Sequence, residues 1–143
     1  MGLETNLPTP YMGSMVTSHP PTLAEFDSIA RRVFQAMPVE FRRMCEGLVI
    51  QSADWPSEET LDDLGIDSPY GLLGLYHGID LTRRSVTHPQ PNQNMVFLYR
   101  QPILAFTKHR GEDLRRVIAH VLIHEVGHHF GLSDDDMHAL AGD

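Results

Sequence analysis

Apolar residues recur at helical spacing near the start of the chain and again toward its end. The first stripe consists of Leu23, Phe26, Ile29, Ala30, Val33, Phe34 and Met37. Residues three and four positions apart share one face of a helix, so this stripe predicts a helix with one buried side. Thr22 and Glu25 have the spacing of a capping box at its start. Pro38 ends this helix and opens a shorter one, which Gly47 closes.

Runs of branched and aromatic residues, bounded by glycine or polar residues, predict strands. We expect strands at 48–52, within 70–77 and within 94–100. A turn is expected at His77 and Gly78, and a loop at 88–93. Further helices are predicted at 57–64 (stopped by Gly65), 102–108, 112–130 and 134–141.

The composition predicts one folded domain preceded by a disordered leader. The chain has 143 residues, of which 41% are hydrophobic, and this is enough for one core. Residues 1–21 carry four prolines and two glycines and show no periodic pattern, so we predict that they are disordered. The folded domain is expected to span residues 22–143.

The charge and the single cysteine restrict the classes of partner and compartment. A formal net charge of −8 repels phosphates and anionic lipids, so neither nucleic acid nor a membrane is an expected partner. Cys45 is the sole cysteine, which rules out an internal disulfide, and we interpret it as a small buried residue. The first residues show neither the basic start nor the apolar stretch of a signal peptide, so we expect none, and no apolar run reaches the ~20 residues that span a bilayer. We therefore expect a cytoplasmic protein.

The predicted helix at 112–130 carries candidate catalytic and metal-binding residues. They lie in the stretch HEVGHHFGLSDDDM, residues 124–137, which begins in this helix. His124 and His128 stand four apart, so a helix places both imidazoles on one face, one turn apart. Glu125 directly follows the first histidine. In this H-E-x-x-H arrangement the histidines bind zinc, and the glutamate is the base that takes a proton from water.

The helical wheel gives an independent reason to regard Glu125 as functional. At 100° per residue, one apolar stripe contains Val117, Ile118, Val121 and Leu122. Glu125 falls near the middle of this stripe, and the two histidines fall along its edge. A carboxylate that faces the core costs several kcal/mol unless it is paired or functional. The interpretation of Glu125 as a solvated helix charge therefore fits poorly.

A catalytic zinc ion requires a third protein ligand, because the helix supplies only two. Gly131 can take the left-handed conformation that ends a helix and turns the chain back toward the histidines. We favour Asp134 as the third ligand, since it occupies the position of the third histidine in a longer zinc motif. Asp135 and Asp136 stay open as alternatives, and the aspartates could instead cap the last helix. Other divalent ions also accept such ligands.

The remaining histidines and two tyrosines receive structural interpretations. His120 lies one turn before His124, at the edge of the metal face. His129 points away from the ligand pair, and we expect His109 and His138 to face solvent. The predicted strands and loops that could line a cleft carry His77, His88, Tyr76 and Tyr99. No pattern selects one of these four residues to polarise a substrate.

Taken together, these motifs resemble the small bacterial zincin-like metallopeptidases, also called mini-zincins. The resemblance covers roughly residues 22–143 and rests on LLGLYHGIDLTRRSV, MVFLYRQPIL and VLIHEVGHHFGLSDDDM. It implies an α+β fold in which a small mixed sheet packs on a central active-site helix with a few flanking helices. It also implies His124, His128 and Asp134 as zinc ligands and Glu125 as the catalytic base.

These considerations leave three functional hypotheses. The first is a zinc-dependent endopeptidase that acts on a peptide or protein, which a strand edge near the metal could hold. The second is a zincin fold that binds a metal or a peptide without cleaving it, since little sequence remains to build a specificity pocket. The third is a metal-dependent endoribonuclease, which the net charge, Glu125 and Asp134 all disfavour. The sequence does not predict an oligomeric state.

Overall fold

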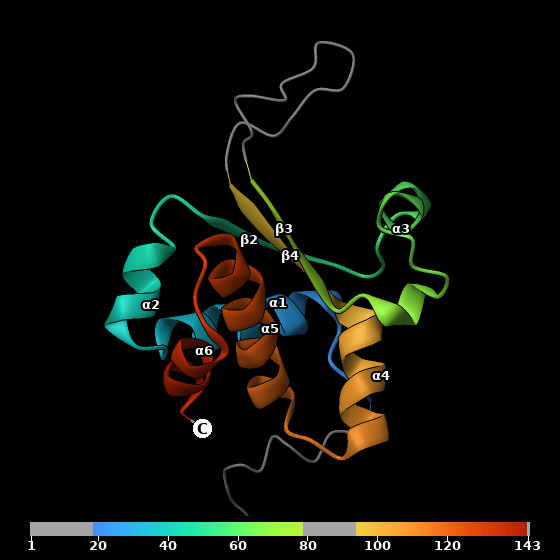
Figure 1. The fold of residues 1–143 in the computed structure, drawn as a ribbon. Coiled ribbons are helices and arrows are strands. Elements are labelled where there is room, and N and C mark those ends of the chain that lie inside the picture. The colour runs from blue at the N-terminus through green and yellow to red at the C-terminus, as the bar shows by residue number, and fades with distance from the viewer. Residues whose placement is uncertain (1–18, 79–93, 143) are drawn as a thin grey trace, which may run out of the picture.

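The computed structural model of the chain describes residues 19–78 and 94–142. Within these ranges there are six α-helices, one short 3-10 helix and three strands (Figure 1). In chain order they are α1 (Leu23–Gln35), α2 (Val39–Met44), β2 (Val49–Ala53), α3 (Glu58–Leu64), the 3-10 helix η2 (Pro69–Gly71), β3 (Gly74–His77), β4 (Met95–Tyr99), α4 (Arg100–Arg110), α5 (Leu114–His129) and α6 (Asp134–Ala141). The predicted loop at 88–93, and the predicted leader up to residue 18, lie outside the described residues.

The order of the elements is as predicted, while several boundaries differ. Helix α2 ends at Met44 rather than at Gly47, which instead takes a left-handed conformation (φ 80°) in the turn before β2. Helix α4 begins at Arg100, directly after β4, two residues before Pro102. A proline is tolerated in the first turn of a helix because its missing N–H would have no partner there. Pro102 therefore lies inside the helix that it was expected to open.

The three strands form a mixed sheet in the order β2-β4-β3. Strand β2 runs parallel to β4, with Val49 opposite Met95. Strand β3 runs antiparallel to β4, with Gly74 opposite Leu98. The predicted small mixed sheet is therefore confirmed, and within it β3 is an edge strand.

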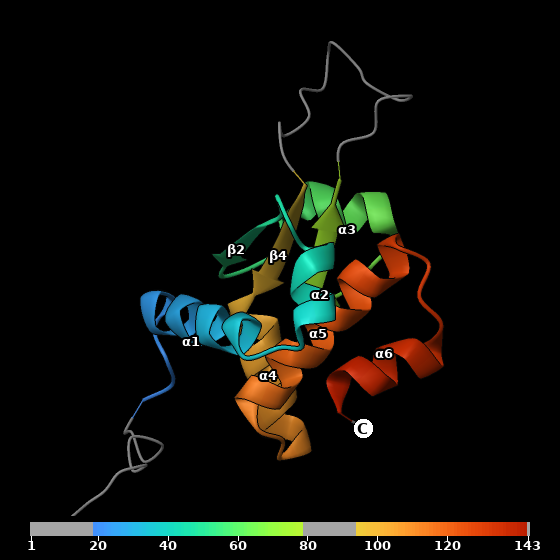
Figure 2. The same cartoon turned by 90° about the vertical axis from the view of Figure 1, so that its left-hand side faces the viewer.

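Helix α5 lies at the centre of the molecule and contacts α1, α4, α6, β3 and β4. Figures 1 and 2 show α1, α4 and α6 around it in both views. The fully buried side chains of the core include Phe26, Phe41, Leu98, Ile103, Ile118 and Leu122. The apolar stripe predicted on this helix is buried, so the prediction of a central helix under a small sheet is confirmed. No helix in residues 19–78 or 94–142 combines the length and the apolar character of a membrane span.

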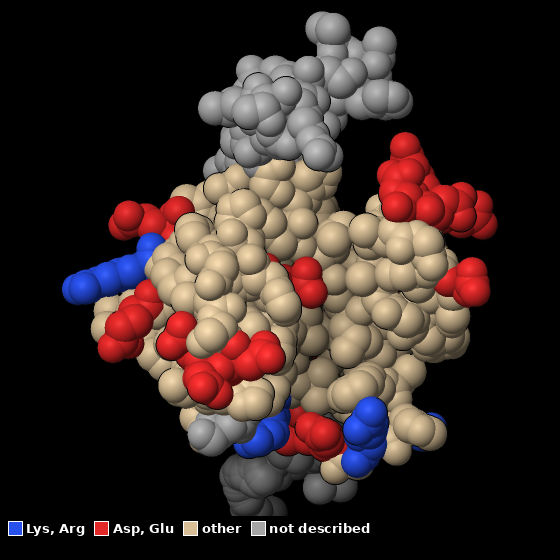
Figure 3. Space-filling view, in the orientation of Figure 1, with Lys and Arg blue, Asp and Glu red and all other residues tan. Residues whose placement is uncertain are grey.

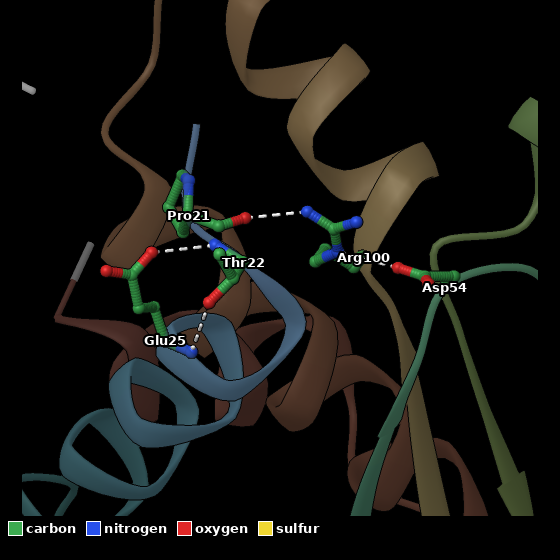
Figure 4. A network of polar contacts seen from close by, with 5 residues as sticks. All are labelled: Pro21, Thr22, Glu25, Asp54 and Arg100. Carbon is green, nitrogen blue, oxygen red and sulfur yellow. Dashed lines mark hydrogen bonds and ion pairs between the residues drawn. The ribbon is translucent and has the colours of Figure 1, made fainter. Parts of the chain in front are cut away.

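A polar network fastens the start of α1 to the sheet (Figure 4). The predicted capping box is present, since the Glu25 amide donates to the Thr22 hydroxyl and the Thr22 amide donates to the Glu25 carboxylate. The guanidinium of Arg100 donates to the Asp54 carboxylate, with an N–O distance of 2.6 Å, and to the main-chain carbonyl of Pro21, also at 2.6 Å. Arg100 thus joins the chain before α1 to the end of β2 and the start of α4.

Candidate active site

Helix α5 presents three histidines in a row along one face. The ring centroids of His124 and His128 are 6.1 Å apart, and those of His120 and His124 are 6.2 Å apart. Spacings of four residues produce this arrangement, because each residue lies one turn below the next. The structure thus places the two predicted histidine ligands on one face and extends the row with His120.

The carboxylate of Glu125 lies between α5 and the edge strand. Its Oε1 accepts a hydrogen bond from the main-chain N–H of Tyr76 in β3, at 3.2 Å. Burial raises the pKa of Glu125, while the bond from Tyr76 and the nearby His128 act in the opposite direction. The prediction that Glu125 faces inward is therefore confirmed. Its role as a catalytic base stays a prediction.

The edge of β3 that points away from β4 faces this carboxylate. The Tyr99 amide donates to the carbonyl of Leu73 at 3.0 Å, so the main chain at Leu73 points toward β4. Main-chain groups alternate in direction along a strand of an antiparallel pair. The N–H and C=O of Gly74 and Tyr76 therefore point away from β4, and the Tyr76–Glu125 bond agrees with this direction. Among the described residues, no strand pairs with this outer edge of β3, which lies next to Glu125.

The turn after α5 leads into α6, whose first turn carries the three aspartates. Gly131 has the left-handed conformation expected from the sequence (φ 72°). Ser133, not an aspartate, is the N-cap of α6: its hydroxyl accepts from the Asp136 amide at 3.0 Å. Asp136 completes the capping box by accepting from the Ser133 amide. The alternative that an aspartate caps the last helix therefore holds in part: Ser133 is the N-cap residue, and Asp136 is its partner in the capping box.

Electrostatics distinguish Asp134 from its two neighbours. Burial lowers the pKa of His124, and the adjacent His120, His128 and His138 lower it further. Asp134 raises it, so its charge acts on the His124 imidazole. Two imidazoles and a carboxylate are donors that suit zinc. In the part of the chain that the structure describes, however, no three His, Cys, Asp or Glu side chains lie close enough together to hold a metal ion. The set of His124, His128 and Asp134 stays a prediction.

A cleft of about 700 Å³ opens beside His124 and Glu125. Its wall is formed by residues 71–74, by Phe106 of α4, by Glu112 and Asp113 just before α5, and by one side of α5 from Arg116 to Glu125. Figure 3 shows the hollow on the face of the molecule that bears α5, with acidic side chains gathered over α3 and α6. Pockets of this size in proteins hold small ligands or short segments of a larger one. The arrangement can therefore hold a ligand against the Glu125 carboxylate.

The other side chains considered from the sequence lie elsewhere. His109 and His138 are exposed, as predicted. The ring of His129 stacks on Tyr76, with ring centroids 4.1 Å apart, which supports its interpretation as a packing residue. Tyr99 is buried, and the described lining of the cleft includes neither Tyr76, His77 nor Tyr99. His88 lies outside the described residues.

Three features of the site were not predicted from the sequence. The Tyr76 N–H is a main-chain group and leaves no trace in a sequence. The cleft residues Leu72, Leu73 and Phe106 look like ordinary core positions. Met137, only 1% exposed, packs on Gly127, where a Cβ atom would lie 2.7 Å from its sulfur. The one available signal was the glycine itself, which allows α6 to approach the motif closely.

Comparison with known proteins identifies the family. A sequence model described as zincin-like metallopeptidase matches residues 45–143, which is more than half of the chain. The match begins at Cys45, just after α2, and includes the sheet and the helices from α3 to α6. No curated protein matches the chain.

Proposed function

Because the chain belongs to the zincin-like metallopeptidase family, we propose that it is a zinc-dependent endopeptidase with Glu125 as its general base. The family membership confirms the resemblance and the zincin-like α+β fold. The observation that carries the proposal is the Glu125 carboxylate, which is half-buried beside the two histidines and bonded to an edge strand. A peptidase needs a base and a site for extended main chain at one place, and we propose Glu125 and the neighbouring edge of β3 for these two roles.

Three side chains are proposed to hold the metal: His124, His128 and Asp134. Zinc, when bound, supplies a Lewis acid that polarises a carbonyl group and increases the acidity of water. The proposal of Asp134 over Asp135 and Asp136 rests on its charge acting on His124 and on the use of Asp136 in the capping box.

Glu125 is proposed to move one proton. Its carboxylate takes the proton from the attacking water as the new C–O bond forms, and passes it to the leaving nitrogen as the C–N bond breaks. The products are a carboxylic acid and an amine, so atoms and charge balance. Since the Tyr76 N–H binds Oε1, we assign the proton to Oε2. The raised pKa of Glu125 lets the carboxyl group keep the proton between the two steps.

The edge of β3 is proposed to bind the substrate. The main-chain groups of Gly74 point away from β4 and lie on the wall of the cleft. An extended peptide can add to such an edge through main-chain hydrogen bonds. This mode of binding recognises a peptide or protein irrespective of most of its side chains.

The test uses two substitutions with matched controls. Glu125→Gln keeps the shape of the side chain, so we expect zinc content to stay at that of the wild type while peptide hydrolysis falls by about 100-fold or more. His128→Ala is expected to lose the zinc. The controls are Glu59→Gln and His109→Ala, both at exposed positions outside the site. Elemental analysis and cleavage of a peptide library are the measurements.

Two different results would contradict the proposed base and the proposed metal. Full hydrolysis by the Glu125→Gln variant would show that another group is the base. A wild-type protein that takes up no zinc, even when zinc is added, would remove the metal from the proposal.

A second candidate is a zincin fold that binds metal or peptide without cleaving it. The observation that favours it over a peptidase is that no three metal-binding side chains converge within the described residues, whereas a catalytic zinc ion needs three protein ligands. Zinc uptake together with intact peptides across the whole library would support this function.

Nucleic acid stays an unexpected partner, since the net charge is −8.

A further inference from the structure

We propose that the cleft beside Glu125 is a specificity pocket that takes a large apolar side chain, aromatic or long aliphatic, from a peptide. This inference rests on the proposed function, because the cleft and the general base form one site. It names the class of substrate, which neither the motif nor the family specifies.

Only one end of the cleft adjoins His124 and Glu125, where the reacting bond is proposed to lie. From His124 and Glu125 it follows α5 back toward the start of the helix, past Val121 and Val117. It therefore extends away from His128 and from Asp134 in α6, two of the three proposed metal ligands. A residue adjacent to the bond under attack would meet this cleft first.

The middle of the cleft is apolar. Its wall there contains Leu72, Leu73, Phe106, Val117 and Val121. Leu72, Leu73 and Phe106 are only half-buried, so apolar surface is left for a ligand to cover. Covering apolar surface contributes about 25 cal/mol per Å², which favours an apolar side chain over a polar one.

One polar ring interrupts this wall. His120 lines the cleft one turn before His124 and is half-buried. An imidazole offers a flat face, and rings pack against rings in offset or edge-to-face arrangements. His120 therefore makes the pocket suitable for an aromatic side chain as well as for an aliphatic one.

The far end of the cleft carries charges of both signs. They belong to Glu112, Asp113 and Arg116. The carboxylate of Asp113 is also engaged as the cap of α5, where it accepts from the Arg115 amide at 3.3 Å. A charged side chain in the cleft would lose its hydration against the apolar wall. Because the charges around it have both signs, no single attraction would offset this cost in free energy.

Gly74 joins the pocket to the edge strand. A Cβ atom there would lie 2.5 Å from Val121 Cγ1 and 2.9 Å from the carbonyl oxygen of Phe97. Only glycine lets β3 approach α5 this closely, and its outward main-chain groups border the cleft. A peptide that pairs with Gly74 would place a neighbouring side chain over the apolar wall, because alternate side chains of an extended chain point to opposite sides.

Cleavage of a peptide library, varied at the residues next to the cleaved bond, tests the inference. We expect kcat/KM for Phe, Leu or Met to exceed that for Ala, Asp or Lys by about tenfold or more. Leu72→Trp fills the cleft and should remove most of this preference. Phe106→Ala enlarges the cleft and should shift the preference toward tryptophan. The control is Leu64→Trp, which adds the same side chain at an exposed position on α3, outside the cleft, and should keep the wild-type preference.

A binding measurement separates the failure of this inference from the failure of the proposed function. The full-length Glu125→Gln variant is titrated with N-acetyl-phenylalanine amide and with N-acetyl-alanine amide, and the main-chain amide signals are followed by NMR. We expect the phenylalanine probe to shift the signals of Gly74, Val117 and Val121, and Leu72→Trp to weaken its binding. This result without cleavage of any peptide would uphold the pocket and reject the peptidase. Cleavage without side-chain preference, or with a preference that Leu72→Trp leaves unchanged, would overturn the pocket and leave the peptidase standing.

Discussion

At the scale of single residues, Glu125 occupies a position where packing alone would place an apolar side chain. It follows the buried Val121 and Leu122 by one turn of α5 and precedes the fully buried Val126. Its carboxylate has a main-chain donor, but burial still raises its pKa. A group of this kind is kept at a cost in stability, and such costs are common at functional sites.

This cost predicts a gain in stability for a variant that is expected to be inactive. A raised pKa means that the folded protein binds the Glu125 proton more tightly than the unfolded chain does. The ionised form therefore destabilises the fold at neutral pH. The penalty shrinks as the pH falls through the folded pKa and is absent below the ordinary value of 4.5. Metal-free Glu125→Gln should melt at a higher temperature than the metal-free wild type at neutral pH, and at the same temperature in acid.

Thermal melts followed by circular dichroism across a pH series would measure this difference. Glu59→Gln on α3, an exposed position, is the control and should show no such trend. Equal melting temperatures of Glu125→Gln and wild type at neutral pH would mean that the ionised carboxylate is well solvated.

At the scale of elements, α6 has two separate tasks in one short sequence. Its first turn contains three aspartates, which the helix dipole favours. Asp136 belongs to the capping box with Ser133, whereas the charge of Asp134 acts on His124. The helix is held against α5 through Met137, which lies on Gly127 of the motif.

The division of tasks predicts opposite effects for two neighbouring substitutions. Asp134→Ala should lower zinc affinity and leave the metal-free protein nearly as stable as the wild type. Asp136→Ala should keep the zinc and lower the free energy of unfolding by about 0.5–2 kcal/mol, the range for a lost helix cap. Asp135→Ala, which removes a similar charge from the same turn, is the control. Zinc titration and urea unfolding are the measurements, and full zinc affinity in Asp134→Ala would reassign the third ligand.

At the scale of the whole molecule, the folded unit is larger than the segment that matches the family. The match begins at Cys45, yet Phe26, Ala30 and Phe41 from the preceding helices are fully buried in the common core. Helix α1 packs on both α5 and β2. Arg100 adds a polar link from the sheet to the chain before this helix. Helix α5 thus depends on residues outside the matched segment.

Truncation tests this dependence. A chain of residues 45–143 should lose cooperative unfolding, because it lacks two fully buried phenylalanines, Phe26 and Phe41. The loss of each costs about 3–5 kcal/mol, which together is comparable with the whole stability of a small domain. A chain of residues 19–143 is the matched control and should melt like the full chain, since the sequence predicts a disordered leader. A sharp, near wild-type transition for residues 45–143 would show that α1 and α2 are dispensable for the fold.

Much of the secondary structure follows from short-range sequence patterns, such as helix caps and glycine stops, and these could be recognised in the sequence. The Thr22–Glu25 capping box and the stop at Gly65 were predicted and are present. The burial of Cys45 was also predicted: it is 6% exposed, and burial raises the pKa of its thiol to about 11. Caps and glycine stops act within one turn of chain, so the order of residues is sufficient to predict them.

The alignment of His124, Glu125 and His128 on one helix was likewise determined by the sequence alone, because helical geometry relates residues a few positions apart. Tertiary structure decided which strand lies at the edge of the sheet and that its Tyr76 N–H, 49 positions away in sequence, binds Glu125. It also decided that the segment 71–74, Phe106 and α5 enclose one cleft. These contacts join distant parts of the chain, and they form because the burial of apolar surface around α5 brings those parts together. Their spacing in the sequence does not indicate that they will be in contact.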